Sequence, residues 1–352
     1  MKVLFVTRKY PPAKGGMEAY SYNLITHYTG EKKSIVLGKK QTHLIWFFPY
    51  TFFYAFFHAK KYDVIELGDM LMSAVGWVAK KRNKNIKVVA TVHGLDITYS
   101  KKIYQKYLKM FSYGFDMYVP NSSYTLEVAE SRGYGPLICV PPATLNENNT
   151  IFPPKDKDKF CKKYEISPDS FVIATTGRLV KRKGVEWFIR NGLANYENKQ
   201  LVYLVVGVGP MEEEIKAAIQ ETGEKRVKML GKISDEDLLE LYTNIDVFLM
   251  PNILVENDVE GFGMVATEAC AASTLVVAAE IQGIKDAIKN NTNGILYEPG
   301  NKDALINILD DVYNNPDKYD SIRNNTRSYV LSKYTGNAVA KSYSEIFENL
   351  FA

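Results

Sequence analysis

A chain of 352 residues is long enough for about two domains of ordinary size, each with its own hydrophobic core. A composition of 46% hydrophobic and 24% charged residues is typical of a globular protein, and a net charge of +4 is too small to imply a nucleic-acid partner. The three cysteines have no metal-ligand spacing and their odd number argues against a disulfide framework, so a reducing cytoplasm is the expected location.

The N-terminus and the longest apolar segment both bear on membranes. The apolar core at residues 3–6 is too short for a signal peptide, so secretion by that route is not expected. Residues 44–59 include nine aromatic side chains. Pro49 interrupts this segment, and the segment is shorter than the ~20 residues that span a bilayer. Lysines flank this segment, which leaves two interpretations: domain core, or a peripheral membrane contact through residues 44–61 at the inner face of the membrane.

The first half of the chain alternates short apolar runs with helical patterns, as in a doubly wound parallel sheet with right-handed crossovers. Gly15 and Gly16 separate the first strand from a helical pattern at residues 17–28. No Gly-x-Gly-x-x-Gly follows that strand, which argues against a dehydrogenase. Strands are predicted at residues 3–6, 35–37, 64–67, 88–92, 117–119 and 137–140.

His93 directly follows the predicted strand at residues 88–92. Ligands of doubly wound sheets gather beyond the carboxyl ends of the strands, so His93 is well placed for a functional role, although a lone histidine is more often structural. Further on, two proline pairs enclose an asparagine-rich stretch, and this punctuation predicts an interdomain linker at residues 146–168. The domains would then be residues 1–145 and 169–336.

The second half repeats the alternation. Its first predicted strand ends at Gly177, and Arg178 and Lys183 follow in a basic loop. A guanidinium and an ammonium at the carboxyl edge of a central strand are natural partners for a diphosphate. Strands are predicted at residues 171–175, 201–206, 227–230, 247–250, 275–278 and 295–297.

A glycine-bounded turn at residues 260–263 precedes a helix that is expected to begin near Met264. The first amides of a helix have no intrahelical partner, so an anion can bind above Gly261, Phe262 and Gly263. Glu260 precedes the turn and Glu268 lies about one helical turn beyond Met264, so both carboxylates can border one pocket.

The acidic segment at Ser234 resembles a metal-binding Asp-x-Asp site only superficially. A capping box explains it better, with Ser234 as the N-cap and Asp237 three residues later, before a leucine-rich helix. No obligatory metal is therefore expected.

These motifs together resemble the retaining glycosyltransferases of family 4, also called glycosyl transferases group 1, which have the GT-B fold. The resemblance covers nearly the whole chain. It implies two Rossmann-like doubly wound parallel-sheet domains that face each other across a cleft, the first on the acceptor side and the second binding the nucleotide sugar. It also implies that a C-terminal helix at residues 337–352 packs back on the first domain.

The resemblance also assigns roles to single residues. Glu268 would hold the ribose of the donor, Glu260 and His93 would contact the transferred sugar, and Arg178 and Lys183 would hold its diphosphate. The catalytic set is then His93, Glu260, Arg178 and Lys183. The donor-binding set is Gly15, Gly16, Gly177, Arg178, Lys183, Gly261, Phe262, Gly263 and Glu268.

The expected activity is the transfer of a hexose or N-acetylhexosamine from a UDP- or GDP-sugar to a glycan or lipid-linked acceptor, with retention of configuration and without a cofactor. Such a reaction belongs to the synthesis of cell-surface polysaccharide or glycolipid. Two other classes stay open: a GT-B sugar-nucleotide epimerase or phosphorylase, and a non-catalytic protein that binds nucleotide sugars.

Overall fold

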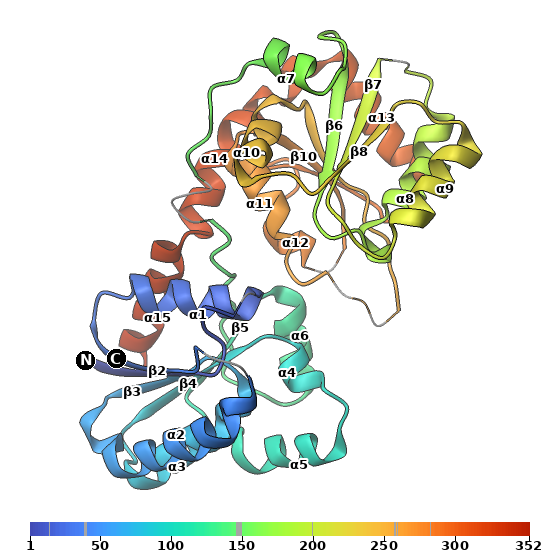
Figure 1. Cartoon of the computed structure of the whole chain (residues 1–352). Helices are drawn as coiled ribbons and strands as arrows, with labels where there is room; N and C mark the ends of the chain where they lie inside the picture. Colours follow the sequence, from blue (N-terminus) through green and yellow to red (C-terminus); the bar gives the residue numbers. More distant parts are fainter. Residues whose placement is uncertain are drawn as a thin grey trace. The chain divides into compact units, whose positions relative to one another are not determined.

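The computed structural model describes the chain apart from residues 14, 39–40, 146–149, 199, 257, 259 and 282. Two compact units share it: residues 1–143 with 333–352 form unit 1, and residues 144–332 form unit 2. Each unit is an α/β layer structure built on one parallel sheet (Figure 1). The expectation of two doubly wound parallel-sheet domains is confirmed.

Unit 1 contains a five-stranded sheet in the order β2-β1-β3-β4-β5, with all neighbours parallel. Both faces of its central strands are buried, which explains why they read as continuous apolar runs rather than as alternating ones. The strands are β1 (Lys2–Thr7), β2 (Glu31–Val36), β3 (Val64–Leu67), β4 (Lys87–Val92) and β5 (Met117–Pro120).

Helices cover both faces of this sheet. Val3 and Phe5 pack in one core with helices at the two ends of the chain, and Leu4 and Val6 pack in another with the helices that follow β2 and β3. The helices are α1 (Gly16–His27), α2 (Leu44–His58), α3 (Ser73–Arg82), α4 (Leu95–Thr98), α5 (Lys102–Phe111), α6 (Ser123–Ser131) and α15 (Gly336–Asn349).

Unit 2 contains a six-stranded parallel sheet in the order β11-β10-β9-β6-β7-β8. Its strands are β6 (Phe171–Thr176), β7 (Leu201–Val206), β8 (Val227–Gly231), β9 (Val247–Met250), β10 (Leu275–Ala279) and β11 (Ile295–Tyr297). Its helices are α7 (Lys157–Lys163), α8 (Val185–Trp187), α9 (Glu212–Thr222), α10 (Asp235–Asn244), α11 (Met264–Ala271), α12 (Ile284–Ala287), α13 (Lys302–Asn314) and α14 (Asp320–Lys333).

One predicted strand is wrong. Residues 137–140 run beside β5 and hydrogen-bond to it, but only a single bridge, between Tyr118 and Leu137, forms. Pro120 and Pro136 have no N–H to donate, so the ladder cannot extend into a regular strand.

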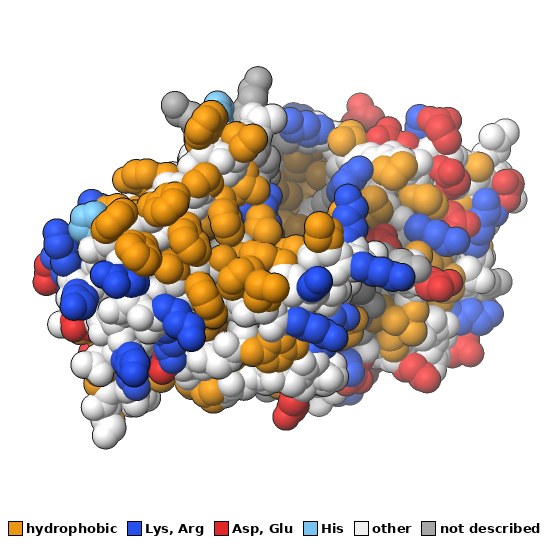
Figure 2. Space-filling view, turned by 90° about the horizontal axis from the view of Figure 1, so that it is seen from below, with side chains coloured by type: hydrophobic (Ala, Val, Ile, Leu, Met, Phe, Trp, Pro, Cys, Tyr) orange, Lys and Arg blue, Asp and Glu red, His pale blue; other side chains and the backbone are white. Residues whose placement is uncertain are grey.

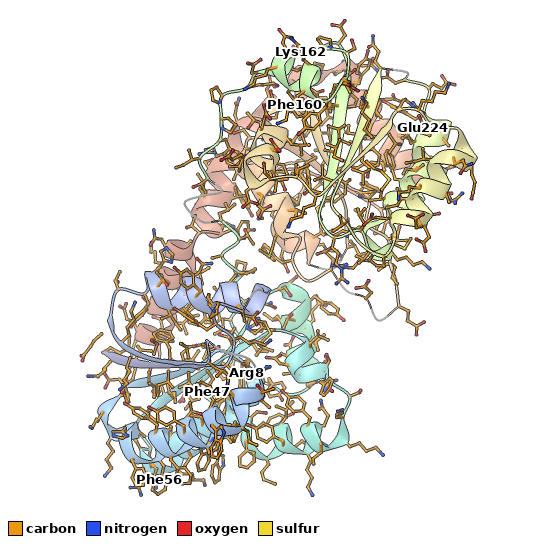
Figure 3. The ribbon with its side chains drawn as sticks, viewed as in Figure 1. Arg8, Phe47, Phe56, Phe160, Lys162 and Glu224 are labelled. Carbon is orange, nitrogen blue, oxygen red and sulfur yellow. The ribbon has the colours of Figure 1, made fainter. Side chains whose placement is uncertain are left out.

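The predicted linker, residues 146–168, begins at four residues outside the described part of the chain, so its boundaries stay a prediction. Within the same segment lies α7, whose Phe160 is fully buried in unit 2 (Figure 3). The C-terminal helix α15 packs on α1 within unit 1, where Tyr343 hydrogen-bonds to Tyr20.

The aromatic segment at residues 44–59 forms α2, and its side chains divide between two environments. Phe47 is buried, and Phe56 packs partly buried against the core (Figure 3). Phe48 and Phe52 are also partly buried against it. Phe53, by contrast, is 57% exposed. Among the residues that the structure describes, no helix is both long and apolar enough to cross a bilayer.

Candidate active site

The basic loop of unit 2 leaves the carboxyl end of β6, a central strand of the sheet. Gly177 has φ 121°, a conformation that a side chain would strain, and it turns the chain out of the strand. Arg178 is exposed, and its guanidinium makes no ion pair or hydrogen bond with the described residues. This cation is therefore available to an anionic ligand.

The far end of the loop is fixed against β9. A Cβ on Gly184, which has φ 66°, would lie 1.8 Å from the carbonyl oxygen of Pro251, directly after that strand. The amide of Ile253 donates to the carbonyl of Arg182 at 3.0 Å. Only glycine allows this close approach of the two backbones. The approach holds the turn Lys181–Lys183 beside the carboxyl end of β9.

Lys183 and Glu260 form a buried ion pair. Their Nζ and Oε2 atoms are 2.8 Å apart, and the residues are 7% and 8% exposed. Asn252 donates its side-chain amide to the same oxygen at 3.2 Å, and Arg182 Nε lies 3.5 Å from it. The sequence indicated roles for Lys183 and Glu260 with a donor, but it did not indicate that they contact each other.

Glu268 is joined to the end of β6 through a tyrosine. Helix α11 begins at Met264 as predicted, and its N-cap Gly263 has φ 77°. The Tyr242 hydroxyl donates to Glu268 Oε2 at 3.2 Å and lies 3.0 Å from Thr176 Oγ1, one residue before Gly177. Burial and the Glu268 carboxylate hold the pKa of Tyr242 well above its usual range, so it stays a neutral donor.

The turn between Glu260 and α11 is held by backbone contacts with the start of α12. The amide of Gly283 donates to the carbonyl of Glu260 at 3.2 Å, and a Cβ on Gly283 would lie 2.0 Å from the carbonyl oxygen of Gly261. Phe262 is buried, with 5% of its surface exposed, so a ligand above this turn would meet backbone amides rather than its ring. A Cβ on Gly177 would contact Val265 of α11 at 3.9 Å, which places the basic loop beside this helix.

Unit 1 has its own cluster, centred on His93 at the end of β4. His93 Nε2 lies 3.1 Å from the carbonyl oxygen of Gly68, which can only accept, so Nε2 carries the proton. Nδ1 then accepts from the side-chain amide of Asn121 at 3.4 Å. Burial lowers the pKa of His93 to about 4, so the ring is neutral at physiological pH.

Asp96 and Asp69 support the His93 loop. The Asp96 carboxylate accepts from the amides of His93 and Met70 at 3.1 and 3.2 Å, and burial raises its pKa to about 7. Asp69 forms an ion pair with Arg8 at 3.2 Å, which brings the end of β1 into the cluster (Figure 3). The contacts of Asp96 with Met70 and of Asp69 with Arg8 join residues that are distant in sequence, so spacing alone could not reveal them.

Gly15 and Gly16 lie at the start of α1, in the same unit. Tyr20 of α1 meets the His93 ring edge to face, with centroids 5.4 Å apart. Glu18 forms an ion pair with Lys9 at 3.1 Å. A Cβ on Gly16 would touch nothing within 4 Å, so unit 1 itself gives no packing reason for a glycine there.

A surface cavity of about 1070 Å³ lies elsewhere in unit 2 and belongs to neither cluster. Lys157, which lines it, forms an ion pair with Asp246 at the amino end of β9, opposite the edge that carries Arg178. Ser234 caps α10 by accepting from the amide of Asp237 at 3.1 Å, as predicted. The described residues contain no group of three His, Cys, Asp or Glu side chains that could hold a metal.

The fold is shared with solved structures, among them a galactosyltransferase. Anabaena HepE, crystallised with UDP, superposes with a TM-score of 0.77 at 19% identity, over 99% of this chain and 100% of that one. The lipopolysaccharide outer core galactosyltransferase WaaB superposes with a TM-score of 0.72 at 19% identity, over the same shares of the two chains. The chain therefore has the GT-B fold.

The family models are more specific. Residues 2–143 match the model named Glycosyltransferase Family 4, and residues 156–329 match Glycosyl transferases group 1. The two matches together account for most of the chain, which belongs to this glycosyltransferase family.

Two curated relatives differ in how far they match. The GDP-mannose-dependent monoacylated alpha-(1-6)-phosphatidylinositol monomannoside mannosyltransferase of Corynebacterium glutamicum is 24% identical over 99% of this chain and 98% of its own. An uncharacterized glycosyltransferase of Methanocaldococcus jannaschii is 29% identical over 55% of this chain. In that match the chain spans about half the length of the relative, 49%.

Proposed function

We propose that this glycosyltransferase moves a hexose or N-acetylhexosamine from a UDP- or GDP-sugar to a glycan or lipid-linked acceptor, with retention of configuration. The observation that carries the proposal is the cluster at the carboxyl edge of the unit 2 sheet. It combines an exposed arginine, a buried Lys183–Glu260 pair and the N-terminus of α11. Such an edge is where doubly wound sheets bind their ligands.

In the proposed reaction, unit 2 stabilises the leaving diphosphate. Negative charge grows there as the glycosidic bond breaks, and Arg178, Lys183 and the amides above Gly263 are the groups suited to receive it. Glu268, oriented by Tyr242, accepts hydrogen bonds from the ribose hydroxyls of the donor. No group of this machinery needs a metal ion.

In unit 1, His93 acts as a neutral hydrogen-bonding group toward the transferred sugar. Its Nε2 proton is already shared with the Gly68 carbonyl, and its low pKa makes it a poor source of positive charge. Glu260 is the second proposed contact to that sugar. Retention then proceeds by front-face attack, in which the leaving phosphate takes the proton of the acceptor hydroxyl.

Relatives support the choice of substrate classes. The C. glutamicum relative is described as GDP-mannose-dependent and acts on a lipid-anchored monomannoside, and a capsular polysaccharide biosynthesis glycosyltransferase of Staphylococcus aureus matches over 54% of this chain at 26% identity. By this analogy, the proposed pathway is polysaccharide or glycolipid synthesis. The proposed location is the cytoplasm, at the inner face of the membrane, through residues 44–61.

Product analysis tests the proposal. Wild-type protein is incubated with UDP- and GDP-hexoses and a membrane extract of acceptors, and products are followed by mass spectrometry and by NMR of the new anomeric centre. The expected product is one sugar larger than the acceptor and has the anomeric configuration of the donor. It should also form when EDTA is present to remove metal ions. Conversion of the sugar nucleotide without a larger saccharide would instead identify an epimerase or phosphorylase.

A further inference from the structure

Three helices of unit 1 form one continuous surface. The Phe48 ring of α2 meets the Tyr107 ring of α5 edge to face, with centroids 6.4 Å apart. Trp77 of α3 meets Phe111 of α5 in the same way at 5.4 Å. The Arg82 guanidinium at the end of α3 lies 4.4 Å from the ring centroid of Phe56 on α2. We call the outer face of α2, α3 and α5, with the adjoining α4, the three-helix surface.

The three-helix surface exposes large apolar side chains in unusual number. Figure 2 shows hydrophobic side chains gathered over much of this face, with lysines and arginines around them. Isolated exposed apolar residues need no explanation, but a contiguous patch marks an interaction site. The large apolar side chains of the three-helix surface that are exposed by 48% or more are Ile45, Trp46, Tyr50, Phe53, Phe57, Leu95, Tyr99, Ile103 and Met110.

The charges on this surface have one sign. Residues 32–62 contain no aspartate or glutamate, and neither do residues 70–95 or 97–115. These stretches include α2, α3 and α5 entirely, whereas the chain as a whole contains 40 acidic residues for 44 lysines and arginines. The exposed cations are Lys60, Lys61, Lys81, Arg82, Lys84, Lys101, Lys102, Lys106 and Lys109.

We propose that the three-helix surface, with α5 as an essential part, docks on an anionic lipid bilayer. Aromatic side chains suit the headgroup zone, and each lysine near an anionic surface adds attraction. A protein partner would need an apolar face bordered by acidic residues, whereas a bilayer supplies both features over any area. This inference extends the proposed contact of residues 44–61 to a second helix that nothing in the sequence indicated.

Docking through α5 has a consequence for the acceptor. Helix α4 begins two residues after His93, and its first residue, Leu95, is 80% exposed. The Tyr104 hydroxyl of α5 donates to the carbonyl of Asp96 at 2.6 Å, so α5 is tied to the His93 loop. An acceptor held by a lipid anchor would therefore present its headgroup near the His93 cluster. This step rests on the proposed function.

Vesicle flotation tests the docking without any assay of transfer. The probes are vesicles of phosphatidylcholine alone and vesicles with about 30 mol% phosphatidylglycerol, which give a surface potential like that of an anionic leaflet. The wild type is expected to float with the anionic vesicles and to float less at high salt. Ile103→Ser/Met110→Ser and Lys102→Glu/Lys106→Glu/Lys109→Glu should each lower the bound fraction by about tenfold.

The matched control is Ile151→Ser, because Ile151 of unit 2 is 75% exposed, as Ile103 is 80% exposed, but lies outside the three-helix surface. It should float like the wild type. Equal flotation of the α5 variants and this control would overturn the proposal. The proposal would also fail if the wild type were a dimer that Ile103→Ser/Met110→Ser converts to a monomer while vesicle binding stays unchanged. Nucleotide binding, followed separately by thermal shift, keeps failure here distinct from failure of the proposed function.

Discussion

The clusters in the two units carry charge differently. In unit 2 the candidate side chains carry charge: Lys183 and Glu260 form an ion pair at 2.8 Å, and the exposed Arg178 belongs to the same loop as Lys183. In unit 1 the central side chain is kept neutral, since burial lowers the pKa of His93 to about 4. The nearby Asp96 is also shifted toward its neutral form, because burial raises its pKa to about 7.

This difference fits two different ligand chemistries. A diphosphate brings negative charge that only cations and helix N-termini can stabilise strongly. A sugar brings neutral hydroxyl groups, for which a neutral imidazole and fixed carbonyls are sufficient partners. If the comparison is right, substitutions of the charged candidates in unit 2 should lower catalytic efficiency much more than substitutions at His93.

The largest expected effect is that of Lys183→Ala. Removal of a cation that faces the developing diphosphate charge should lower kcat/KM by about 10³, the size seen when one group that stabilises transition-state charge is lost. Steady-state kinetics on the nucleotide sugar measures it. The control is Lys181→Ala, an exposed lysine of the same turn, which should keep wild-type kinetics.

Lys183→Ala also removes the nearest cation from the buried Glu260 carboxylate, which keeps Asn252 and Arg182 beside it. Breaking a buried ion pair in this way can cost up to about 3–5 kcal/mol of stability. Lys183→Ala/Glu260→Ala removes both charges, and it is compared with Glu260→Ala because Glu260 is itself a proposed contact to the sugar. The double variant should recover melting temperature relative to Lys183→Ala, yet turn over more slowly than Glu260→Ala. Equal turnover of these two variants would mean that the lysine is structural only.

Glu268→Ala should rank second. Hydrogen bonds to a charged group contribute about 1.5–3 kcal/mol, so the donor Kd should rise roughly tenfold to a hundredfold with little change in kcat. Tyr242→Phe removes only the hydroxyl that donates to Glu268 and should raise the Kd less. Isothermal titration with UDP and GDP measures both. An unchanged Kd in Glu268→Ala would exclude the glutamate from the donor site.

His93→Ala should lower kcat by about tenfold and leave the donor Kd unchanged, because a neutral hydrogen bond contributes only about 0.5–1.5 kcal/mol. His43→Ala, an exposed histidine before α2, is the control. The wild-type pH profile should show no ionisation near 6.5 that belongs to His93, since its pKa lies near 4. A change in rate with a midpoint near pH 6.5 that disappears in His93→Gln would contradict the neutral role.

The smallest expected effect concerns stability. Glu66 on β3 is 2% exposed and accepts from Thr91 Oγ1 at 2.7 Å, and burial raises its pKa to about 8. The folded state therefore holds a proton that the unfolded state releases near pH 4.5, so stability falls as pH rises through this range. His93, with its lowered pKa, acts in the opposite direction, but only below about pH 6.5.

Between pH 6.5 and 8, Glu66 should thus lower stability by about 2 kcal/mol, or roughly 4–8 °C in Tm. Asp96, whose pKa is raised to about 7, adds a smaller decline over the same range. Glu66→Gln keeps the shape and an oxygen for Thr91, and should remove the larger part of the decline. Scanning calorimetry at both pH values measures it. An equally steep decline in the variant would show that Glu66 is already ionised in the folded state.

The sequence was sufficient for the buried strands, because each is a local apolar run, but it missed the start of β2, where residues 31–34 are exposed and polar. It failed at residues 137–140, where hydrophobicity suggested a strand but neighbouring prolines limit pairing. It also singled out Lys183, Glu260 and Glu268 as candidate site residues, which stay predictions, but it did not indicate their contacts in the fold. The contacts with Glu260 and Tyr242 join elements far apart in the chain, and no local spacing encodes them.

The central claim is that the unit 2 cluster binds the nucleotide diphosphate of an activated sugar. Thermal shift of wild type, Arg178→Ala and Lys181→Ala with UDP, GDP and ADP tests it most directly, since a ligand that binds only the folded state raises Tm. We expect UDP or GDP to raise the Tm of wild type and Lys181→Ala, and to do so much less for Arg178→Ala. No shift with any nucleotide, or equal shifts in all three proteins, would contradict the account.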